Sequence, residues 1–284
     1  MNLYPIPAAC LERCPRPGRV ERVDYVTTDG LDDRKHALVY LPHGYDESCP
    51  YDVFYLIHGG GGDQTSFFSD TFLAVLDNLI DRGQLAPLIV VSPTYYRPGP
   101  VDKGIGASGE AVALFARELK ADIIPAVESR FRTHAASTDA AGIRASRDHR
   151  GIGGFSMGSV TTWYAFLEAL DAFRWFMPLS GDCWLFGRLG GSLHAEETAR
   201  ALADAVAKQG FAPEDFRVHA ITGTKDIACP NESAQIDAMR RFPEVFRFGG
   251  NIDYDLLEDG VHDYADIFRY LYNALPAFFH SRQA

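Results

Sequence analysis

A serine between two glycines is the residue of this chain with the clearest capacity for chemistry. Residues 154–158 have the sequence GFSMG, which follows an apolar run and precedes a helical pattern. A serine on a tight turn from a strand into a helix holds its hydroxyl clear of the sheet, and the flanking glycines prevent clashes. The helix start also offers unpaired N–H groups where an oxyanion would form. Ser156 is therefore a candidate nucleophile, and an inert serine in a glycine-rich turn is the alternative.

A serine hydroxyl is a weak nucleophile without a base, so a histidine and a carboxylate are also needed. In this kind of site the acid and then the histidine follow the serine along the chain. His262 fits the base best, because it lies in a loop between the last expected strand and the last expected helix. Asp226, in a turn just past a strand, fits the acid that would orient the imidazole. The alternatives are His194, His219, His280, Asp182, Asp259 and Asp263.

A run of four glycines provides a second element of such a site. Residues 59–62 follow His58 at the end of an apolar run. Glycines let the backbone approach a substrate oxygen closely, so we predict that the amides of Gly60 and Met157 form an oxyanion hole. The run is not a phosphate-binding loop, because no Gly-Lys-Ser/Thr follows it. His58 is expected to support the loop rather than to act as a base.

The elements that must position these residues alternate between short strand-like runs and helical periods, which is typical of an α/β chain. The runs at 53–57 and 87–91 are continuously apolar, as in a parallel sheet with both faces covered. The first two strands alternate more and are joined by a turn near Gly30, which indicates an antiparallel edge. The expected strands are 20–27, 36–41, 53–58, 88–93, 150–155, 175–179, 218–222 and 254–257.

Helical periods lie between these strands. Pro125 falls inside one of them and predicts a kink or a helix boundary. The polar segment 133–149 predicts a surface loop. Because no repeat or long linker divides the chain, we expect one domain over 1–284, in which 1–19 is an N-terminal extension. The expected helices are 71–82, 110–130, 159–170, 195–209, 232–241 and 264–279.

The composition excludes several other classes of protein. The 284 residues include 27 basic and 38 acidic side chains, and the net charge of −11 disfavours nucleic acid or an anionic membrane as a partner. With 46% hydrophobic residues the chain can form a core, and no apolar stretch reaches the roughly 18 residues of a membrane span. The first residues lack a secretory signal pattern, which predicts a cytoplasmic protein, or a secreted one if a signal was removed.

The cysteines are too few for a disulfide framework, and their number is odd. Cys10 and Cys14 resemble half of a zinc site, but no second pair follows at a suitable spacing. We therefore expect mostly free thiols. Bound metal and cofactor are expected to be none. The five are Cys10, Cys14, Cys49, Cys183 and Cys229.

Taken together, these motifs resemble those of carbohydrate esterase family 1, in particular the feruloyl esterase modules of bacterial xylanases. The likeness runs from about residue 25 to residue 279, and its main motifs are 58–62 (HGGGG), 154–158 (GFSMG), 178–184 (PLSGDCW) and 260–262 (GVH). The resemblance implies an α/β-hydrolase fold, with one doubly wound, mostly parallel sheet of about eight strands and no large lid. It also implies a metal-free serine esterase with the triad Ser156, Asp226 and His262.

The substrate that the resemblance implies is a hydroxycinnamoyl ester, chiefly of ferulate, on arabinoxylan or its oligosaccharides, cleaved through an acyl-enzyme. The alternatives are an acetyl-xylan esterase, an S-formylglutathione-type esterase, an acyltransferase, or a carbohydrate-binding protein built on an inactive hydrolase. Without a signal peptide, an intracellular enzyme acting on imported oligosaccharides is expected. The oligomeric state stays open.

Loops near the expected triad supply candidate substrate-binding residues. Trp184 follows an expected strand, and its flat ring would suit stacking on a cinnamoyl group or a sugar face, although a core tryptophan is the alternative. Cys229 stands where the family usually has an aromatic residue, and Ser159 where it often has glycine. A disulfide between Cys183 and Cys229 stays open. The candidates are Trp184, Asp182, Cys183, Cys229, Gly61 and Tyr95.

Overall fold

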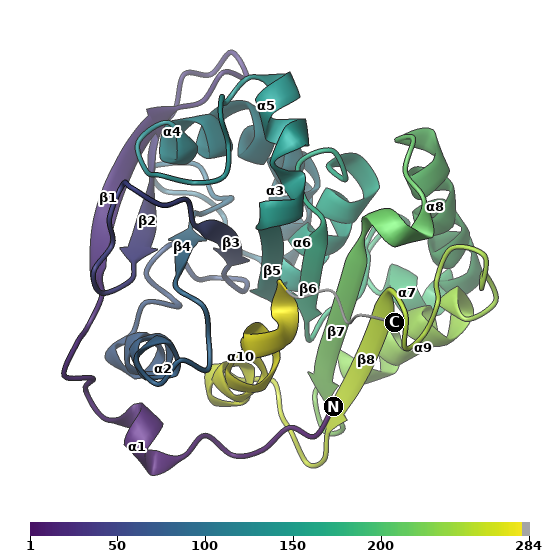
Figure 1. The fold of residues 1–284 in the computed structure, drawn as a ribbon. Helices are drawn as coiled ribbons and strands as arrows, with labels where there is room; N and C mark the ends of the chain where they lie inside the picture. Colours follow the sequence, from purple (N-terminus) through teal and green to yellow (C-terminus); the bar gives the residue numbers. More distant parts are fainter. Residues whose placement is uncertain (280–284) are drawn as a thin grey trace.

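One eight-stranded sheet forms the centre of the molecule (Figure 1). The computed structural model describes residues 1–279, so His280 lies outside the described residues. The strands lie side by side in the order β1-β2-β4-β3-β5-β6-β7-β8, and each overlaps one of the eight predicted strands. Their bounds are Arg19–Val26 (β1), Arg34–Leu41 (β2), Asp52–Ile57 (β3), Leu88–Ser92 (β4), Arg150–Phe155 (β5), Trp175–Leu179 (β6), Arg217–Gly223 (β7) and Ile252–Leu257 (β8).

The directions of the strands bring several loops to one edge of the sheet. β1 pairs with β2, and β2 with β4, in antiparallel fashion, which confirms the predicted antiparallel edge. The other neighbours, from β4 to β8, are parallel. Because parallel strands end at the same edge, the loops after β3, β5, β6, β7 and β8 meet there. The predicted single, mostly parallel sheet is therefore confirmed.

Helices cover both faces of this sheet (Figure 1). α2 and α10 pack on one face, and α3, α6 and α8 pack on the other. Among residues 1–279, none of the helices combines the length and the apolar character that crossing a bilayer requires. The helices are Ala8–Leu11 (α1), Asp70–Asp81 (α2), Ile105–Glu118 (α3), Ile124–Glu128 (α4), Ala140–Ala145 (α5), Met157–Glu168 (α6), Gly190–Leu193 (α7), Ala195–Lys208 (α8), Cys229–Met239 (α9) and Tyr264–Phe278 (α10).

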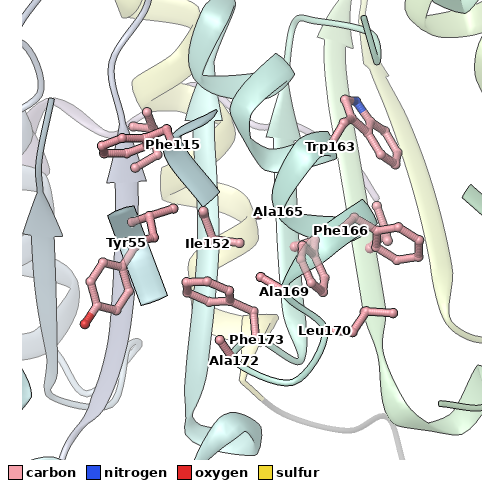
Figure 2. Close-up of a cluster of buried hydrophobic side chains, with 14 of the residues drawn as sticks. Tyr55, Phe115, Ile152, Trp163, Ala165, Phe166, Ala169, Leu170, Ala172 and Phe173 are labelled. Carbon is pink, nitrogen blue, oxygen red and sulfur yellow. The ribbon is translucent and has the colours of Figure 1, made fainter. Parts of the chain in front are cut away.

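Alternation along β3 divides the core into two layers. Phe54 and Leu56 belong to the layer that α2 and α10 cover, whereas Tyr55 and Ile57 belong to the layer under α3 and α6. Figure 2 shows the second layer, in which Tyr55 and Phe115 lie among aromatic and small side chains. Burying a large apolar side chain contributes roughly 1.5–3 kcal/mol, so both layers hold the central strands firmly in place.

The helix predicted over 110–130 is divided in the structure. It begins earlier, at Ile105, and a π-helical turn over Leu119–Ile123 joins α3 to α4. Pro125 lies in the first turn of α4, where its missing N–H is not needed for an intrahelical bond. The predicted boundary at this proline is therefore confirmed.

The prediction of an irregular loop over 133–149 is wrong in part. This segment contains α5 and a 3₁₀ turn over Arg147–His149, and the side chain of Arg147 is buried. Asp139 caps α5 by accepting a hydrogen bond from the amide of Gly142 at 2.8 Å. Helices this short show no apolar periodicity, so the sequence pattern could not indicate α5.

The residues before β1, which were expected to form an extension, lie along α10 and α2. Arg269 of α10 donates a hydrogen bond to the carbonyl of Leu3 at 3.1 Å, and Asn78 of α2 donates to the carbonyl of Glu12 at 2.8 Å. The side chains of Leu3 and Cys10 are buried against these helices. The N-terminal segment is therefore packed on the same face as α2 and α10.

The close approach of α6 to β3 predicts a large cost for a side chain at Gly158. A Cβ there would lie 2.0 Å from the carbonyl oxygen of Ile57, which is sheet backbone and cannot move away. We expect Gly158→Ala to lower the free energy of unfolding by about 2–3 kcal/mol or more in urea titrations. Gly106→Ala is the control, because Gly106 is also helical but a Cβ there meets nothing within 4 Å. Gly106→Ala should raise the free energy of unfolding by up to about 1 kcal/mol. Equal shifts for the two variants would contradict this packing.

Candidate active site

The turn between β5 and α6 holds Ser156 in a strained conformation. Its φ of 55° and ψ of −111° lie outside the regions that most residues adopt, at a cost of about 1–3 kcal/mol. The amide of Ser156 donates to the carbonyl of Leu179 at 3.0 Å, which fixes the turn to β6. A Cβ at Gly154 or Gly158 would lie 2.4 or 2.0 Å from the carbonyl oxygen of Ile57. Both glycines are therefore required for this turn, as the sequence predicted.

The structure brings together the three side chains of the expected triad from the ends of three strands. His262 Nε2 lies 2.9 Å from Ser156 Oγ, and His262 Nδ1 lies 2.7 Å from Asp226 Oδ1. With Nδ1–H donating to Asp226, the lone pair of Nε2 faces the serine hydroxyl. Asp226 is buried and also accepts a hydrogen bond from the amide of Ala228 at 2.7 Å. The arrangement can move the serine proton to the imidazole.

Two backbone amides face the same cavity as this hydroxyl. Gly60 and Met157 both line the cavity, and a Cβ at Gly60 would lie 3.2 Å from Met157 Cγ, so the two loops touch. The amide of Met157 is the first of α6 and has no carbonyl partner within the helix. Within residues 1–279, the amide of Gly60 has no hydrogen-bond partner either. Both N–H groups are thus available to a ligand oxygen.

His58 supports the glycine loop, as expected from the sequence. Its Nδ1 donates to the carbonyl of Gly59 at 2.8 Å, and its Nε2 lies 2.8 Å from the hydroxyl of Thr94. Burial lowers the pKa of His58 to about 4, so the ring is neutral at physiological pH. Its two nitrogens are occupied by these bonds, and the ring does not line the cavity.

Tyr95 also supports the loop, which corrects its prediction as a substrate-binding residue. Its ring is buried and its hydroxyl donates to the carbonyl of Gly59 at 3.0 Å. The neighbouring Tyr96 accepts a hydrogen bond from the amide of Gly61 at 3.0 Å. Gly61 itself lines the cavity, in a left-handed conformation with φ of 77°. Two tyrosines and a histidine therefore hold the loop from behind.

The cavity above Ser156 has a volume of about 390 Å³ and a largely apolar wall. Ser156, His262 and Trp184 all line it. Ile227, directly after Asp226, is 75% exposed at the rim. The sequence analysis missed several lining residues, because no motif marks these positions in loops and at the starts of helices: Lys103, Ile105, Val160, Arg188, Leu189, Ile227 and Asn231.

Asp182 fixes the ring of Trp184 at the cavity. The indole N–H of Trp184 donates to Asp182 Oδ1 at 3.1 Å, and the amide of Gly191 donates to Oδ2 at 2.8 Å. Burial raises the pKa of Asp182 above its ordinary value. Both residues line the cavity, as predicted, but the carboxylate is occupied by these bonds. Asp182 thus positions the ring.

The predictions that Cys183 and Cys229 bind substrate are wrong. Neither residue lines the cavity. The side chain of Cys183 is fully buried in the core layer under α3 and α6, and burial raises its thiol pKa to about 12. Cys229 begins α9, and its sulfur lies 3.7 Å from the hydroxyl of Ser233. Both thiols are unpaired in the structure.

Comparisons with known proteins agree with this geometry. A family model described as "Putative esterase" matches residues 28–278, so the chain belongs to this esterase family. Endo-1,4-beta-xylanase Y of Acetivibrio thermocellus is 38% identical over 283 residues, which cover 97% of this chain and 24% of that protein. The chain thus spans about a quarter of the length of this relative.

Two solved structures are similar to this chain over almost its whole length. A mutant of the feruloyl esterase module from Clostridium thermocellum, complexed with sinapinate, has a TM-score of 0.87 and 38% identity over 99% of this chain and 95% of that one. A CE1 ferulic acid esterase from Anaeromyces mucronatus, in complex with ferulic acid, has a TM-score of 0.73 at 18% identity, covers 96% of both chains, and shows the fold alone. The predicted resemblance, the α/β-hydrolase fold and the serine esterase class are confirmed.

Glu232, which the sequence analysis did not consider as a site residue, lies buried behind the triad. Its Oε2 accepts a hydrogen bond from the amide of Gly181 at 3.2 Å. A Cβ at Gly181 would lie 2.8 Å from the carbonyl oxygen of Ser156, so Glu232 supports the nucleophile turn through this glycine. Burial, together with the charges of Asp226 and Asp182, raises the pKa of Glu232 well above its ordinary value. The buried site therefore favours the protonated form of Glu232.

The raised pKa of Glu232 predicts that stability falls as the pH rises. Above about pH 4.5 the unfolded chain loses this proton while the folded chain keeps it, which costs about 1.4 kcal/mol per pH unit until the folded pKa is passed. Glu232→Gln removes this dependence. Its free energy of unfolding relative to wild type should therefore rise as the pH increases above about 5 in urea titrations.

Glu244→Gln, at an exposed glutamate, is the control and should show no such trend. A difference between Glu232→Gln and wild type that stays constant with pH would contradict a protonated Glu232.

Proposed function

We propose that this chain is a feruloyl esterase, which hydrolyses hydroxycinnamoyl esters on arabinoxylan or on its oligosaccharides. One observation carries the proposal: the hydroxyl of Ser156, in contact with His262, opens into an apolar cavity beside Trp184. The related module that was solved with sinapinate, a hydroxycinnamate, supports the same class of acyl group. No metal or cofactor takes part in the proposed reaction.

In the first half of the reaction, His262 takes the proton of Ser156 as its Oγ attacks the ester carbonyl. The N–H groups of Gly60 and Met157 donate to the oxyanion that forms. Asp226, which accepts from His262 Nδ1 at 2.7 Å, stabilises the imidazolium. The tetrahedral intermediate then collapses. The C–O bond to the sugar breaks, and the sugar oxygen takes the proton from His262.

The second half releases the acid. Water enters beside His262, which takes one of its protons while the oxygen attacks the acyl carbon. The oxyanion occupies the same two amides. Collapse breaks the bond to Ser156 Oγ, and His262 returns the proton to the serine. Because the imidazole of His262 is partly exposed to solvent, water can reach it without a movement of the sheet.

The shape and lining of the cavity favour an aromatic acyl group over acetate. An acetyl group would occupy only a small part of about 390 Å³ and would leave the apolar wall exposed to water. A cinnamoyl ring can bury the wall and pack against the indole of Trp184, which Asp182 holds in place. The apolar wall is formed by Ile105, Val160, Leu189 and Ile227.

We expect a higher kcat/KM for methyl ferulate than for an aryl acetate or for S-formylglutathione, by about tenfold or more, because only the ferulate ring fills the apolar cavity. The same assay with Ser156→Ala should show a loss of about a millionfold in kcat, since the hydroxyl of Ser156 is the one that contacts His262 Nε2. Ser129→Ala, at an exposed serine, is the matched control and should keep full activity.

Comparable kcat/KM values for the ferulate and acetate esters would contradict the preference for an aromatic acid. A faster reaction with S-formylglutathione would favour a thioester hydrolase instead. A Ser156→Ala variant that keeps more than a few per cent of the wild-type rate would exclude Ser156 as the nucleophile.

A further inference from the structure

The loop before α3 contacts the glycine loop through one side chain that the proposed mechanism does not use. Lys103 lies two residues before the start of α3, and it lines the active-site cavity together with Gly60 and Gly61. Its Nζ donates a hydrogen bond to the carbonyl of Gly62 at 3.1 Å. A cation of the β4–α3 loop is thus bound to the backbone that supplies one donor of the oxyanion hole.

The run of four glycines needs such partners, because glycine leaves the backbone free to rotate. The amide of Gly62 donates to the carbonyl of Gly59 at 3.2 Å, which closes a turn with Gly60 and Gly61 at its centre. Two buried side chains behind the loop donate to the same carbonyl. The C=O and N–H of a trans peptide point in opposite directions, so these bonds aim the N–H of Gly60 away from them and toward the cavity. The oxyanion donor therefore depends on this turn.

A chain of hydrogen bonds joins the centre of the turn to Lys103. The amide of Gly61 donates to the hydroxyl of Tyr96 at 3.0 Å, and this hydroxyl lies 2.6 Å from Ser108 Oγ. Ser108 Oγ donates to the carbonyl of Lys103 at 3.3 Å, which leaves the Tyr96 hydroxyl to donate to Ser108. Because Lys103 Nζ binds Gly62, the circuit closes on the turn in which it began. Hydrogen bonds in such a chain polarise and strengthen one another.

Lys103 also covers the ring of Tyr96. Its Nζ lies 4.9 Å from the ring centroid, within the range of a cation–π contact. Tyr96 is buried, and a cation–π contact is stronger where little water reaches the ring. One ammonium group thus contacts both the carbonyl of Gly62 and the ring whose hydroxyl binds Gly61. An uncharged side chain of the same length can make neither the hydrogen bond nor the cation–π contact.

We propose that Lys103 is a positioning residue for the oxyanion hole. By clamping the turn at Gly62 and Tyr96, it holds the N–H of Gly60 toward the reacting carbonyl. This inference rests on the ester hydrolysis proposed above, in which Gly60 donates to the oxyanion. The oxyanion forms only as Ser156 attacks, so a well-placed donor lowers the barrier without strengthening the binding of the ester. Loss of Lys103 should therefore lower kcat and leave KM unchanged.

The test compares Lys103→Met with wild type in the hydrolysis of methyl ferulate. We expect kcat to fall by about tenfold, because loss of a direct oxyanion donor costs about a hundredfold or more and Lys103 acts through the loop. KM should stay within about twofold. Lys103→Arg keeps a cation and a donor, so its kcat should recover to within about threefold of wild type. Lys208→Met, at an exposed lysine at the end of α8, is the matched control and should keep full activity.

An aryl acetate separates this inference from the choice of substrate. Because the oxyanion is common to all esters, Lys103→Met should lose the same factor in kcat, within about twofold, with methyl ferulate and with the acetate. A wild type that prefers the acetate would contradict the feruloyl esterase but not this ratio. A loss confined to one ester, or a raised KM at unchanged kcat, would overturn the inference, because Lys103 would then contact the substrate itself. So would a kcat of Lys103→Met equal to that of wild type.

Two further readouts do not depend on a particular ester. The rate at which a fluorophosphonate labels Ser156 uses the same oxyanion hole and should also fall by about tenfold in Lys103→Met. Tyr96→Phe removes the acceptor of the Gly61 amide. Since both changes loosen one turn, the double variant should lose less than the product of the two single losses. A loss equal to that product, or an unchanged labelling rate in Lys103→Met, would overturn the proposed role.

Discussion

The close contact between the turn at Ser156 and the end of β3 is the constraint on which the site depends. Gly154 and Gly158 leave no room for a side chain beside the carbonyl of Ile57. The strained serine can therefore project its hydroxyl from the sheet edge, while the start of α6 presents its first amide to the same cavity. The strain is held by the two core layers that fix β3 and β5. A looser sheet would relax the turn.

The remaining parts of the site are held by hydrogen bonds from buried polar side chains, most of which do not line the cavity. His58, Tyr95 and Tyr96 bind the glycine loop from behind through their polar atoms. Asp182 performs the same role for Trp184, and buried Glu232 holds Gly181. Ile105, Val160, Leu189 and Ile227 supply apolar parts of the cavity wall, and buried polar side chains support the loops behind it. This division suits a site that binds an aromatic acyl group and positions a proton relay.

Much of the fold and of the triad could be predicted from the sequence, because apolar period and strand-turn-helix spacing are local patterns. GFSMG before a helical pattern identified Ser156, and position after a strand identified Asp226 and His262. The direction in which each side chain points was harder to predict from the sequence. Asp182 and Trp184 reach the cavity, whereas Cys183 between them points into the core. The role of Glu232 depends on helix packing, which no short motif specifies.

The central claim is that Ser156, activated by His262, forms the covalent acyl-enzyme. The most direct measurement is reaction of the wild-type chain with a fluorophosphonate, followed by mass spectrometry of the intact chain and its peptides. The account predicts one adduct per chain, located on Ser156, and little labelling of His262→Ala, because its serine is no longer activated. An adduct on another residue, or rapid labelling of Ser156 without His262, would contradict the account.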